Sequence, residues 1–351
     1  MTSSIEFGLD TFGDVTLGAD GLPLSHAQVI RNVIAEAELA DSVGIDAFGV
    51  GEHHRPDFAI SAPEVMLAAI AGRTRTIRLG SSVTVLSTDD PVRVYERFTT
   101  LDGASGGRAE VILGRGSFTE SYPLFGYDLG DYQALFEDKL ALFMELLKYD
   151  RTGEPVTWKG RMYPALDRQR PFPRTESGGL AVSVGVGGSP ESVVRAARHA
   201  LPLTLAIIGG DPRRFLPYIQ LYYQSLDQRG HGRLPVAVHS HGYVAESDAQ
   251  ARAELFEPWR DMRNRIGAER GWPSTTMREF EHEVEGGSLY VGAPDTVARR
   301  IAATVRALGL ARFTIKYSAG TLAHQNLMRC IELFGREVIP RVRELLAGQP
   351  D

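Results

Sequence analysis

Two adjacent histidines, His53 and His54, follow an apolar run at residues 45–50 and precede a loop that contains Pro56. If both continue an extended strand, their side chains point to opposite faces, so we expect only one imidazole to face a site at the strand's end. An imidazole that titrates near pH 7 can accept or donate a proton. We favour this acid–base role over a structural, hydrogen-bonded role for both rings. A metal site is disfavoured because adjacent histidines do not converge on one ion.

A second segment whose residues could bind a ligand is Gly114-Arg115-Gly116, which follows a buried run at residues 108–113. Glycines on both sides let the backbone approach a ligand, and the guanidinium can fork onto an oxyanion such as phosphate. An ordinary glycine-rich turn, with Arg115 in an ion pair, explains the segment equally well. The sequence leaves both interpretations open at this point.

A third segment opens from a strand through Gly187 and Gly188 onto a helix that begins with Ser189 and Pro190. The free N–H groups and the dipole of a helix N-terminus favour an anion there, and Ser189 and Ser192 add two hydroxyls. A capped helix without a ligand is the alternative. The second and third segments follow neighbouring predicted strands, so we expect Arg115 and the serines to reach one phosphate.

The elements that must position these residues alternate between strands and helices, which predicts an α/β fold with a parallel sheet. Eight strands are the number of a (β/α)8 TIM barrel, in which the loops after the strands form the active site. The predicted strands cover residues 5–10, 45–50, 77–86, 108–113, 181–186, 203–208, 236–244 and 312–317. The predicted helices cover residues 25–43, 62–74, 92–104, 131–148, 190–200, 211–228, 249–266, 294–308 and 322–346.

We expect a single domain over residues 1–351 with two insertions, at residues 149–177 and 263–287. Ser25, Asp131, Ser189 and Asp211 are the residue types that cap helix N-termini. The second insertion is rich in glycine and has a charged middle, a composition typical of a mobile loop. We therefore interpret residues 263–287 as a candidate lid over the active site.

Composition excludes several classes of protein. With 43% hydrophobic and 23% charged residues, the chain is typical of a globular protein, and no apolar run reaches the roughly 18 residues of a membrane span. The lone Cys330 and the lack of a signal peptide indicate the cytoplasm. A net charge of −6, spread along the chain, gives no general attraction to nucleic acid.

The order and spacing of these motifs resemble the bacterial luciferase-like flavin-dependent monooxygenases over nearly all of the chain. The segments that carry the resemblance are GIDAFGVGEHH, IRLGSSVTVLSTDDPVRVYERFTTLDGASGGR, VILGRGSFTESYPLFGYDL, VGVGGSPESV and VGAPDTVARRIAATVRALGLARFTIKYSAG. The resemblance implies a (β/α)8 barrel that binds reduced FMN at the carboxyl ends of the strands.

The resemblance also assigns roles to individual residues. It implies that the FMN phosphate lies on Arg115, Ser189 and Ser192, beside the backbone of Gly187 and Gly188. His53 would be the acid–base group at the reactive edge of the flavin. The cis peptide that the family holds after its third strand maps to Ser82–Val83, which would also border the cofactor.

Two departures from the family bear on the substrate. Luciferases carry a reactive cysteine where this chain has Gly114, and an acidic residue where it has Gly188. We therefore do not expect oxidation of long-chain aldehydes with light emission. The two insertions are the parts expected to contact the substrate.

We predict a cytoplasmic monooxygenase that uses reduced FMN and O₂ on a small organic molecule. The reduced flavin would come from a separate reductase, because no NAD(P)H-binding domain is recognisable. Family resemblance suggests a homodimer through helices beside the second and third strands. The alternatives are a deazaflavin-dependent dehydrogenase or reductase of the same superfamily, and a flavin-binding protein without catalysis.

Overall fold

Eight parallel strands form a closed ring in the computed structural model, which describes residues 5–18, 20–176 and 178–348. The ring follows the chain from β1 to β12, and β12 pairs with β1 to close it. Its strands are β1 (Glu6–Thr11), β2 (Ala47–Val50), β3 (Arg78–Ser81), β5 (Ala109–Gly114), β8 (Ala181–Val186), β9 (Leu203–Ala206), β10 (Val236–Val244) and β12 (Arg312–Lys316). The predicted barrel and all eight of its strands are confirmed.

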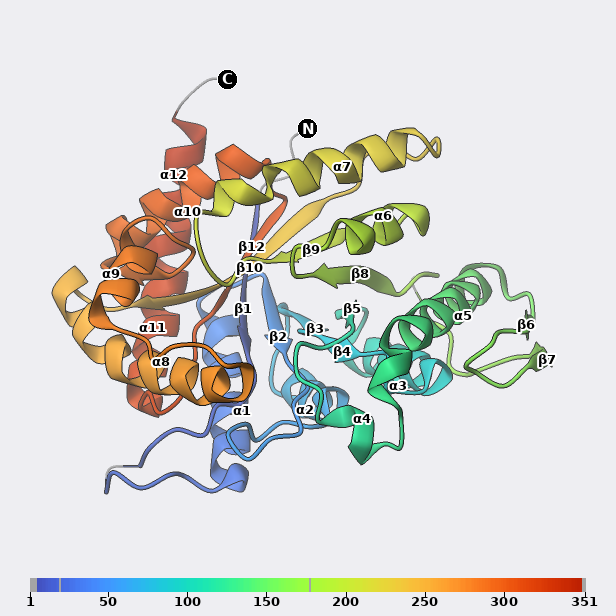
Figure 1. Cartoon of the computed structure of the whole chain (residues 1–351), viewed down its shortest axis with the longest axis horizontal. Coiled ribbons are helices and arrows are strands. Elements are labelled where there is room, and N and C mark those ends of the chain that lie inside the picture. Colours follow the sequence, from blue (N-terminus) through green and yellow to red (C-terminus); the bar gives the residue numbers. More distant parts are fainter. Residues whose placement is uncertain (1–4, 19, 177, 349–351) are drawn as a thin grey trace.

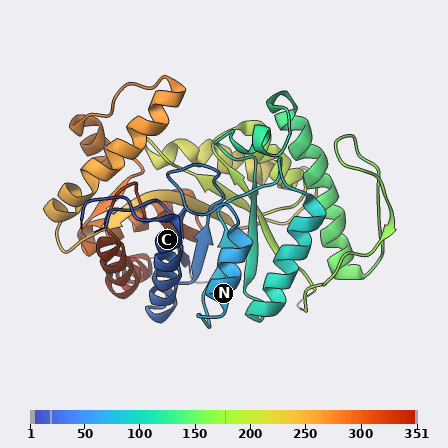
Figure 2. The same cartoon turned by 90° about the horizontal axis from the view of Figure 1, so that it is seen from below.

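Helices surround the ring, as Figure 1 shows. They are α1 (His26–Ser42), α2 (Pro63–Ala71), α3 (Pro91–Ser105), α4 (Ser121–Leu124), α5 (Tyr132–Thr152), α6 (Pro190–Arg198), α7 (Leu216–Asp227), α8 (Asp248–Arg270), α9 (Met277–Glu285), α10 (Pro294–Leu308), α11 (His324–Leu333) and α12 (Ile339–Ala347). Figure 2 shows α1, α2 and α3 side by side along the outside of the barrel, where each contacts the next.

Four short strands lie outside the eight of the ring: β4 (Thr84–Val85), β6 (Val156–Trp158), β7 (Leu166–Gln169) and β11 (Tyr290–Gly292). The predicted strand at residues 77–86 is divided into β3 and β4 by a cis peptide between Ser82 and Val83. Strands β6 and β7 form an antiparallel ribbon beyond α5, within the predicted insertion at residues 149–177. The last residue of that insertion, Ser177, lies outside the described residues, as do residues 1–4 and 349–351 of the predicted domain.

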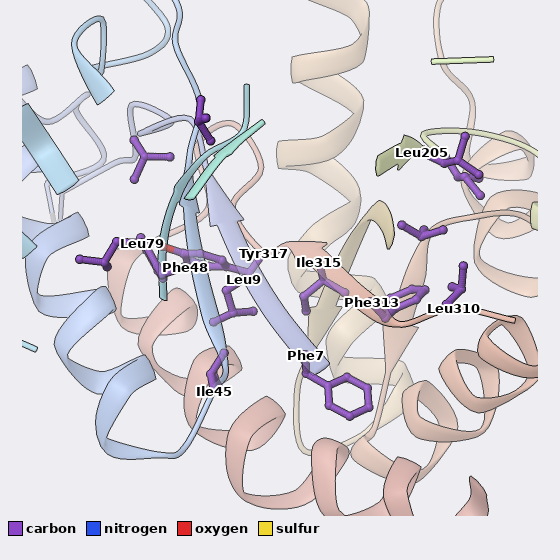
Figure 3. Packing of buried hydrophobic residues seen from close by; sticks show 14 of the residues in the cluster. Phe7, Leu9, Ile45, Phe48, Leu79, Leu205, Leu310, Phe313, Ile315 and Tyr317 are labelled. Atoms are coloured by element: carbon purple, nitrogen blue, oxygen red, sulfur yellow. The ribbon is translucent and has the colours of Figure 1, made fainter. Parts of the chain in front are cut away.

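Strand residues alternate between the two faces of the barrel wall. In β1, the fully buried Phe7 and Leu9 face the helices, and Figure 3 shows them in one cluster with Phe313 and Ile315 of β12. The intervening residues face the barrel interior, where Gly8 lies against Thr314: a Cβ on Gly8 would come within 2.7 Å of Oγ1 of Thr314. The wall is therefore held from outside by apolar packing between strands and helices.

The interior at the amino ends of the strands is lined by an ionic ring that comprises Glu6, Arg78, Glu110 and Arg312. Arg312 donates to Glu6 at 3.0 Å and to both carboxylate oxygens of Glu110. These guanidiniums hold the pKa of the Glu110 carboxyl below its ordinary value, although burial acts in the opposite direction. Polar residues and glycines thus fill positions that branched aliphatic side chains occupy in most barrels of this type.

The segment predicted as a mobile loop, residues 263–287, is largely helical, so that prediction is wrong. Its first part continues α8 to Arg270, and its second part is α9. Thr276 and Glu279 form a capping box at the start of α9, whose Phe280 and Val284 are buried. Glycine content misled the prediction, whereas the Thr-x-x-Glu spacing is the signal of a helix start.

Candidate active site

The two histidines after β2 diverge, as expected from an extended backbone. His54 bonds through Nε2 to Oε1 of Glu52 at 3.0 Å, and the second carboxylate oxygen of Glu52 accepts the backbone N–H of Val85 at 2.9 Å. His54 and Glu52 therefore tie the loop after β2 to β4. His53 takes part in neither bond, and it lines a cavity with residues at the end of β4 and after β5 at the carboxyl-terminal mouth of the barrel.

His53 lies in a box of aromatic side chains. Its ring centroid is 4.4 Å from that of Phe12, 4.6 Å from that of Phe58 and 5.0 Å from that of Phe118. Burial among these rings, reinforced by the positive charge of Lys316, lowers the pKa of His53 to about 3. The imidazole is therefore neutral near pH 7, with one ring nitrogen able to accept a proton and the other able to donate.

A cluster that we call the anion site comprises Arg115, Ser189, Ser192 and Arg195. Arg115 donates to the hydroxyl of Ser192 at 3.0 Å, and Arg195 donates to the same oxygen at 3.1 Å. The Ser192 hydroxyl in turn lies 3.3 Å from Oγ of Ser189. The structure therefore brings together the arginine after β5 and the two serines after β8, as the sequence predicted.

Arg195, which lies one turn beyond Ser192 on α6, was not predicted as a site residue. Its buried guanidinium also pairs with Glu137 and donates to Gln133 at 3.2 Å. The signal was its spacing of three residues from Ser192, which places both side chains on one face of a helix. Arg195 orients the serine and adds positive charge to the site.

The backbone before α6 completes the anion site. Ser189 caps the helix by accepting the backbone N–H of Ser192 at 3.3 Å, and Gly188 has a left-handed φ of 106° that favours glycine. The space beside Gly187 is open, since a Cβ there would meet no atom within 4 Å. The Ser189 hydroxyl donates to the exposed carboxylate of Glu191 at 2.7 Å, a bond that an incoming anion would replace.

The predicted cis peptide, Ser82–Val83, is present and lies between the barrel strands and the mouth. Ser82 donates its hydroxyl proton to Asp10 at 3.1 Å. Val83 packs on two glycines: a Cβ on Gly114 would come within 2.5 Å of Cγ2 of Val83, and one on Gly185 within 3.0 Å of Cγ1. Glycine at position 114, where luciferases carry cysteine, is therefore required by the side chain of Val83.

Two further pairs at the mouth were not recognised in the sequence. Nδ1 of His239, on β10, lies 2.5 Å from Oδ2 of Asp10 on β1. Lys316 of β12 donates to Asp14 at 2.8 Å, and both side chains are almost fully buried. Only closure of the barrel brings the members of each pair together, because about 230 or more residues separate them along the chain.

The carboxyl-terminal end of α8 lies over the loops after β2 and β5. Glu269 accepts from Arg55 at 2.8 Å, and Arg270 donates to the backbone oxygen of Ser117 at 2.8 Å. Arg55 also pairs with Glu120 beyond β5. These contacts join the end of α8 to the loops after β2 and β5, beside His53.

The cavity beside His53 measures only about 20 Å³, which is room for about one water molecule. Its lining includes Glu52, His54, Gly116 and Phe118. An aromatic ligand reaches His53 only if the loop after β5 or the end of α8 moves. The anion site needs no such rearrangement beyond the exposed Glu191, and its two guanidiniums and two hydroxyls suit a phosphate group.

Within residues 5–18, 20–176 and 178–348, no group of three or more His, Cys, Asp or Glu side chains is placed to hold a metal ion. Over the same residues, no helix is both long and apolar enough to cross a bilayer. Cys330 is buried, and its sulfur accepts the backbone N–H of Val244 at 3.2 Å.

Solved structures share this fold over nearly their whole length. The monooxygenase RslO1 from Streptomyces bottropensis has a TM-score of 0.82 and 23% identity, with 96% of this chain and 99% of that chain covered. The oxygenating constituent of 3,6-diketocamphane monooxygenase from Pseudomonas putida, solved in complex with FMN, has a TM-score of 0.79 and 19% identity over 97% and 99% of the chains. An F420-dependent secondary alcohol dehydrogenase has a TM-score of 0.73 and 17% identity over 96% and 99%.

Sequence comparison extends beyond the fold. The 4-hydroxyprotoasukamycin monooxygenase of Streptomyces nodosus subsp. asukaensis is 28% identical over 326 residues, which cover 89% of this chain and 86% of the relative. The family described as luciferase-like monooxygenase matches residues 11–312, from β1 to the start of β12. The chain therefore belongs to the luciferase-like monooxygenase family of flavin-dependent oxidoreductases.

Proposed function

We propose that the chain is a monooxygenase that uses reduced FMN and O₂ to oxidise a small organic substrate. The observation that carries this proposal is the convergence of Arg115 and Arg195 on Ser192, at the N-terminus of α6 and beside the mouth. A phosphate there would receive charged hydrogen bonds from Arg115 and neutral ones from Ser189. The FMN complex of the 3,6-diketocamphane enzyme supports the choice of FMN through its shared fold.

When held by Arg115, Ser189 and Ser192, reduced flavin would supply the electrons that activate oxygen, and the protein would control its surroundings. In this proposal the anion site holds the phosphate, while Ser82 and Val83 border the ring system. His53 is neutral near pH 7 because burial lowers its pKa to about 3. It therefore offers one N–H donor and one weakly basic acceptor nitrogen, rather than the group titrating near pH 7 that the sequence predicted, in an aromatic box from which water is largely excluded.

The end of α8 would act as the lid in each catalytic cycle. Its opening admits the cofactor and the substrate, and its closure through Arg55, Glu269 and Arg270 shields the reacting groups from water. The contacts are mostly ionic and partly exposed, with the Glu269 side chain 51% exposed. Such pairs contribute little stability, so the lid can open at little energetic cost.

Binding of FMN and of F420 to the protein, measured separately by equilibrium dialysis, tests the cofactor. We expect retention of FMN; retention of F420 alone would instead support the deazaflavin-dependent dehydrogenase. The F420-dependent alcohol dehydrogenase, whose fold this chain shares, is the reason to test that alternative. Binding of neither cofactor would refute both functions.

The role of His53 is tested by the reaction of protein-bound reduced FMN with O₂, followed through flavin absorbance in a stopped-flow instrument. We expect His53→Ala to leave FMN affinity unchanged and to change the oxidation rate of bound flavin by on the order of 10²-fold or more. His231→Ala, after α7, is the matched control. Unchanged kinetics in His53→Ala would remove the assigned role and favour a flavin-binding protein without catalysis.

The remaining predictions concern partners. A separate flavin reductase, a homodimer through α2 and α3, and a cytoplasmic location stay predictions from the sequence. The exposed Val65 on α2, with 71% of its surface accessible, is available for such an interface. Sedimentation of the purified protein would reveal the oligomeric state.

A further inference from the structure

A histidine–carboxylate pair lies at the mouth outside the residues that hold or face the cofactor in the proposed function. His239 and Asp10 are 8% and 1% exposed, and Nδ1 of His239 lies 2.5 Å from Oδ2 of Asp10. No described residue hydrogen-bonds the other ring nitrogen, Nε2, or the second carboxylate oxygen of Asp10. A buried carboxylate with an unpaired oxygen calls for a functional explanation, because most buried polar atoms in proteins are bonded.

The pair is fixed from several sides. Asp10 accepts the hydroxyl of Ser82, and its carboxylate therefore joins the pair to the cis peptide beside the predicted cofactor. The ring of Phe12 is nearly parallel to that of His239, at 6.4 Å between centroids, and also contacts His53. One aromatic ring thus connects the two imidazoles across the mouth.

We propose that His239 is a second acid–base group, positioned by Asp10, and that it accepts a proton from an aromatic hydroxyl of the substrate. This proposal rests on the function proposed above and adds the substrate class. The carboxylate of Asp10 accepts Nδ1–H, which leaves a basic lone pair on Nε2. The O–H bond of a phenol breaks, the N–H bond forms at Nε2, and the phenolate remains in the site.

The surroundings suit this chemistry. Asp10 stabilises the imidazolium that the transfer creates, as a charged hydrogen bond is stronger than a neutral one. Phe12, Phe58 and Phe118 pack around His53 at the mouth, so a flat ring that enters when the end of α8 moves would meet aromatic side chains. The proton later returns to the product or to solvent.

Other charged and titratable groups near His239 lie on neighbouring elements. His241, also on β10, has its ring centroid 6.2 Å from that of His239. Lys316 on β12 lies over the ring of Phe12, and His53 lies on that ring as well. Arg263 on α8 is close enough to His241 for its positive charge to lower the pKa of that histidine, which burial lowers first. Lys316 is paired with Asp14 and Ser318. Asp10 is thus the carboxylate that bonds directly to His239.

The chromogenic phenol 4-nitrophenol tests the proposal, because its phenolate absorbs visible light. We expect the wild-type protein to bind the probe and to raise its ionised fraction above that of the free probe at the same pH. Asp10→Asn and His239→Gln should lose this increase. His324→Gln is the matched control, since His324, the first residue of α11, bonds to Glu36 at 2.7 Å in another histidine–carboxylate pair that does not include Asp10 or His239.

A second readout needs no ligand. In ¹⁵N-histidine NMR spectra, we expect neutral His239 as the Nδ1–H tautomer, and Asp10→Asn should shift it towards Nε2–H, because an amide no longer offers two acceptor oxygens. Absence of probe binding, equal ionisation in all four proteins, or an unchanged tautomer would overturn the proposal. All probe spectra are recorded with and without FMN. If the wild-type protein does not bind FMN but still raises the ionised fraction of 4-nitrophenol, the flavin assignment is refuted and the role of His239 is not.

Discussion

Replacement of Arg115 by alanine gives the most direct test of the anion site. The guanidinium, in the loop after β5, donates to Ser192 at 3.0 Å and lies over the ring of Tyr132. Hydrogen bonds to charged groups contribute about 1.5–3 kcal/mol. Arg195 remains as a second cation on Ser192, so we expect the lower half of that range, which corresponds to a roughly 10–50-fold weaker Kd for FMN.

The assay compares FMN with riboflavin, which lacks the phosphate. Fluorescence titration of wild type and Arg115→Ala with both ligands isolates the contribution of the phosphate as a double-mutant cycle does for two side chains. FMN should lose affinity, whereas riboflavin should bind both proteins equally. Arg213→Ala is the matched control, because this arginine follows β9, is 76% exposed and pairs with Asp211. Equal losses for both ligands, or none for FMN, would refute the phosphate assignment.

Three further predictions concern the mouth. Because the pKa of His53 is about 3 in the folded protein and near 6.5 when unfolded, only the unfolded state binds this proton between those values, and stability falls as pH falls. Between pH 7 and pH 5, the free energy of unfolding measured with denaturant should fall in both proteins, but by up to about 2 kcal/mol less in His53→Gln than in wild type. An equal decrease in the two proteins would contradict the low pKa of His53. Gly114→Cys should destabilise by about 1–3 kcal/mol through its clash with Val83, and Val83→Ala should restore most of that loss, as thermal unfolding can check. Glu269→Gln should speed FMN association in stopped-flow fluorescence while stability changes by less than about 1 kcal/mol; an unchanged rate would show that the lid does not limit binding.

The fold was largely predictable because the strands have an apolar outer face and are followed by glycine, proline or charged residues that mark where they end. The strand at residues 236–244 and the helix Pro294–Leu308 were predicted with the bounds that the structure shows. Three of the four predicted helix caps are confirmed, namely Ser25, Ser189 and Asp211, whereas Asp131 makes no capping bond. Asp128 instead caps the 3₁₀ turn that leads into α5.

The site was predictable only where residues that act together follow neighbouring strands. Arg115 and Ser192 met this condition, because adjacent parallel strands end at one rim. His239 and Asp10 did not: their contact depends on β10, β12 and β1 taking consecutive places in the closed ring. The aromatic box of His53 was equally hidden, since Phe12 and Phe118 come from loops after different strands. Glycine content also concealed the helices within residues 263–287.

Closure of the ring between its first and last strands has a consequence for synthesis of the chain. β1 leaves the ribosome about 300 residues before its pairing partner β12, which begins at Arg312. Until then β1 is an open edge, and Glu6 and Glu110 can pair with Arg78 but lack Arg312, the second guanidinium of the ionic ring. Nascent chains without β12 therefore expose an unpaired strand edge and an incomplete ionic ring, and open strand edges favour aggregation.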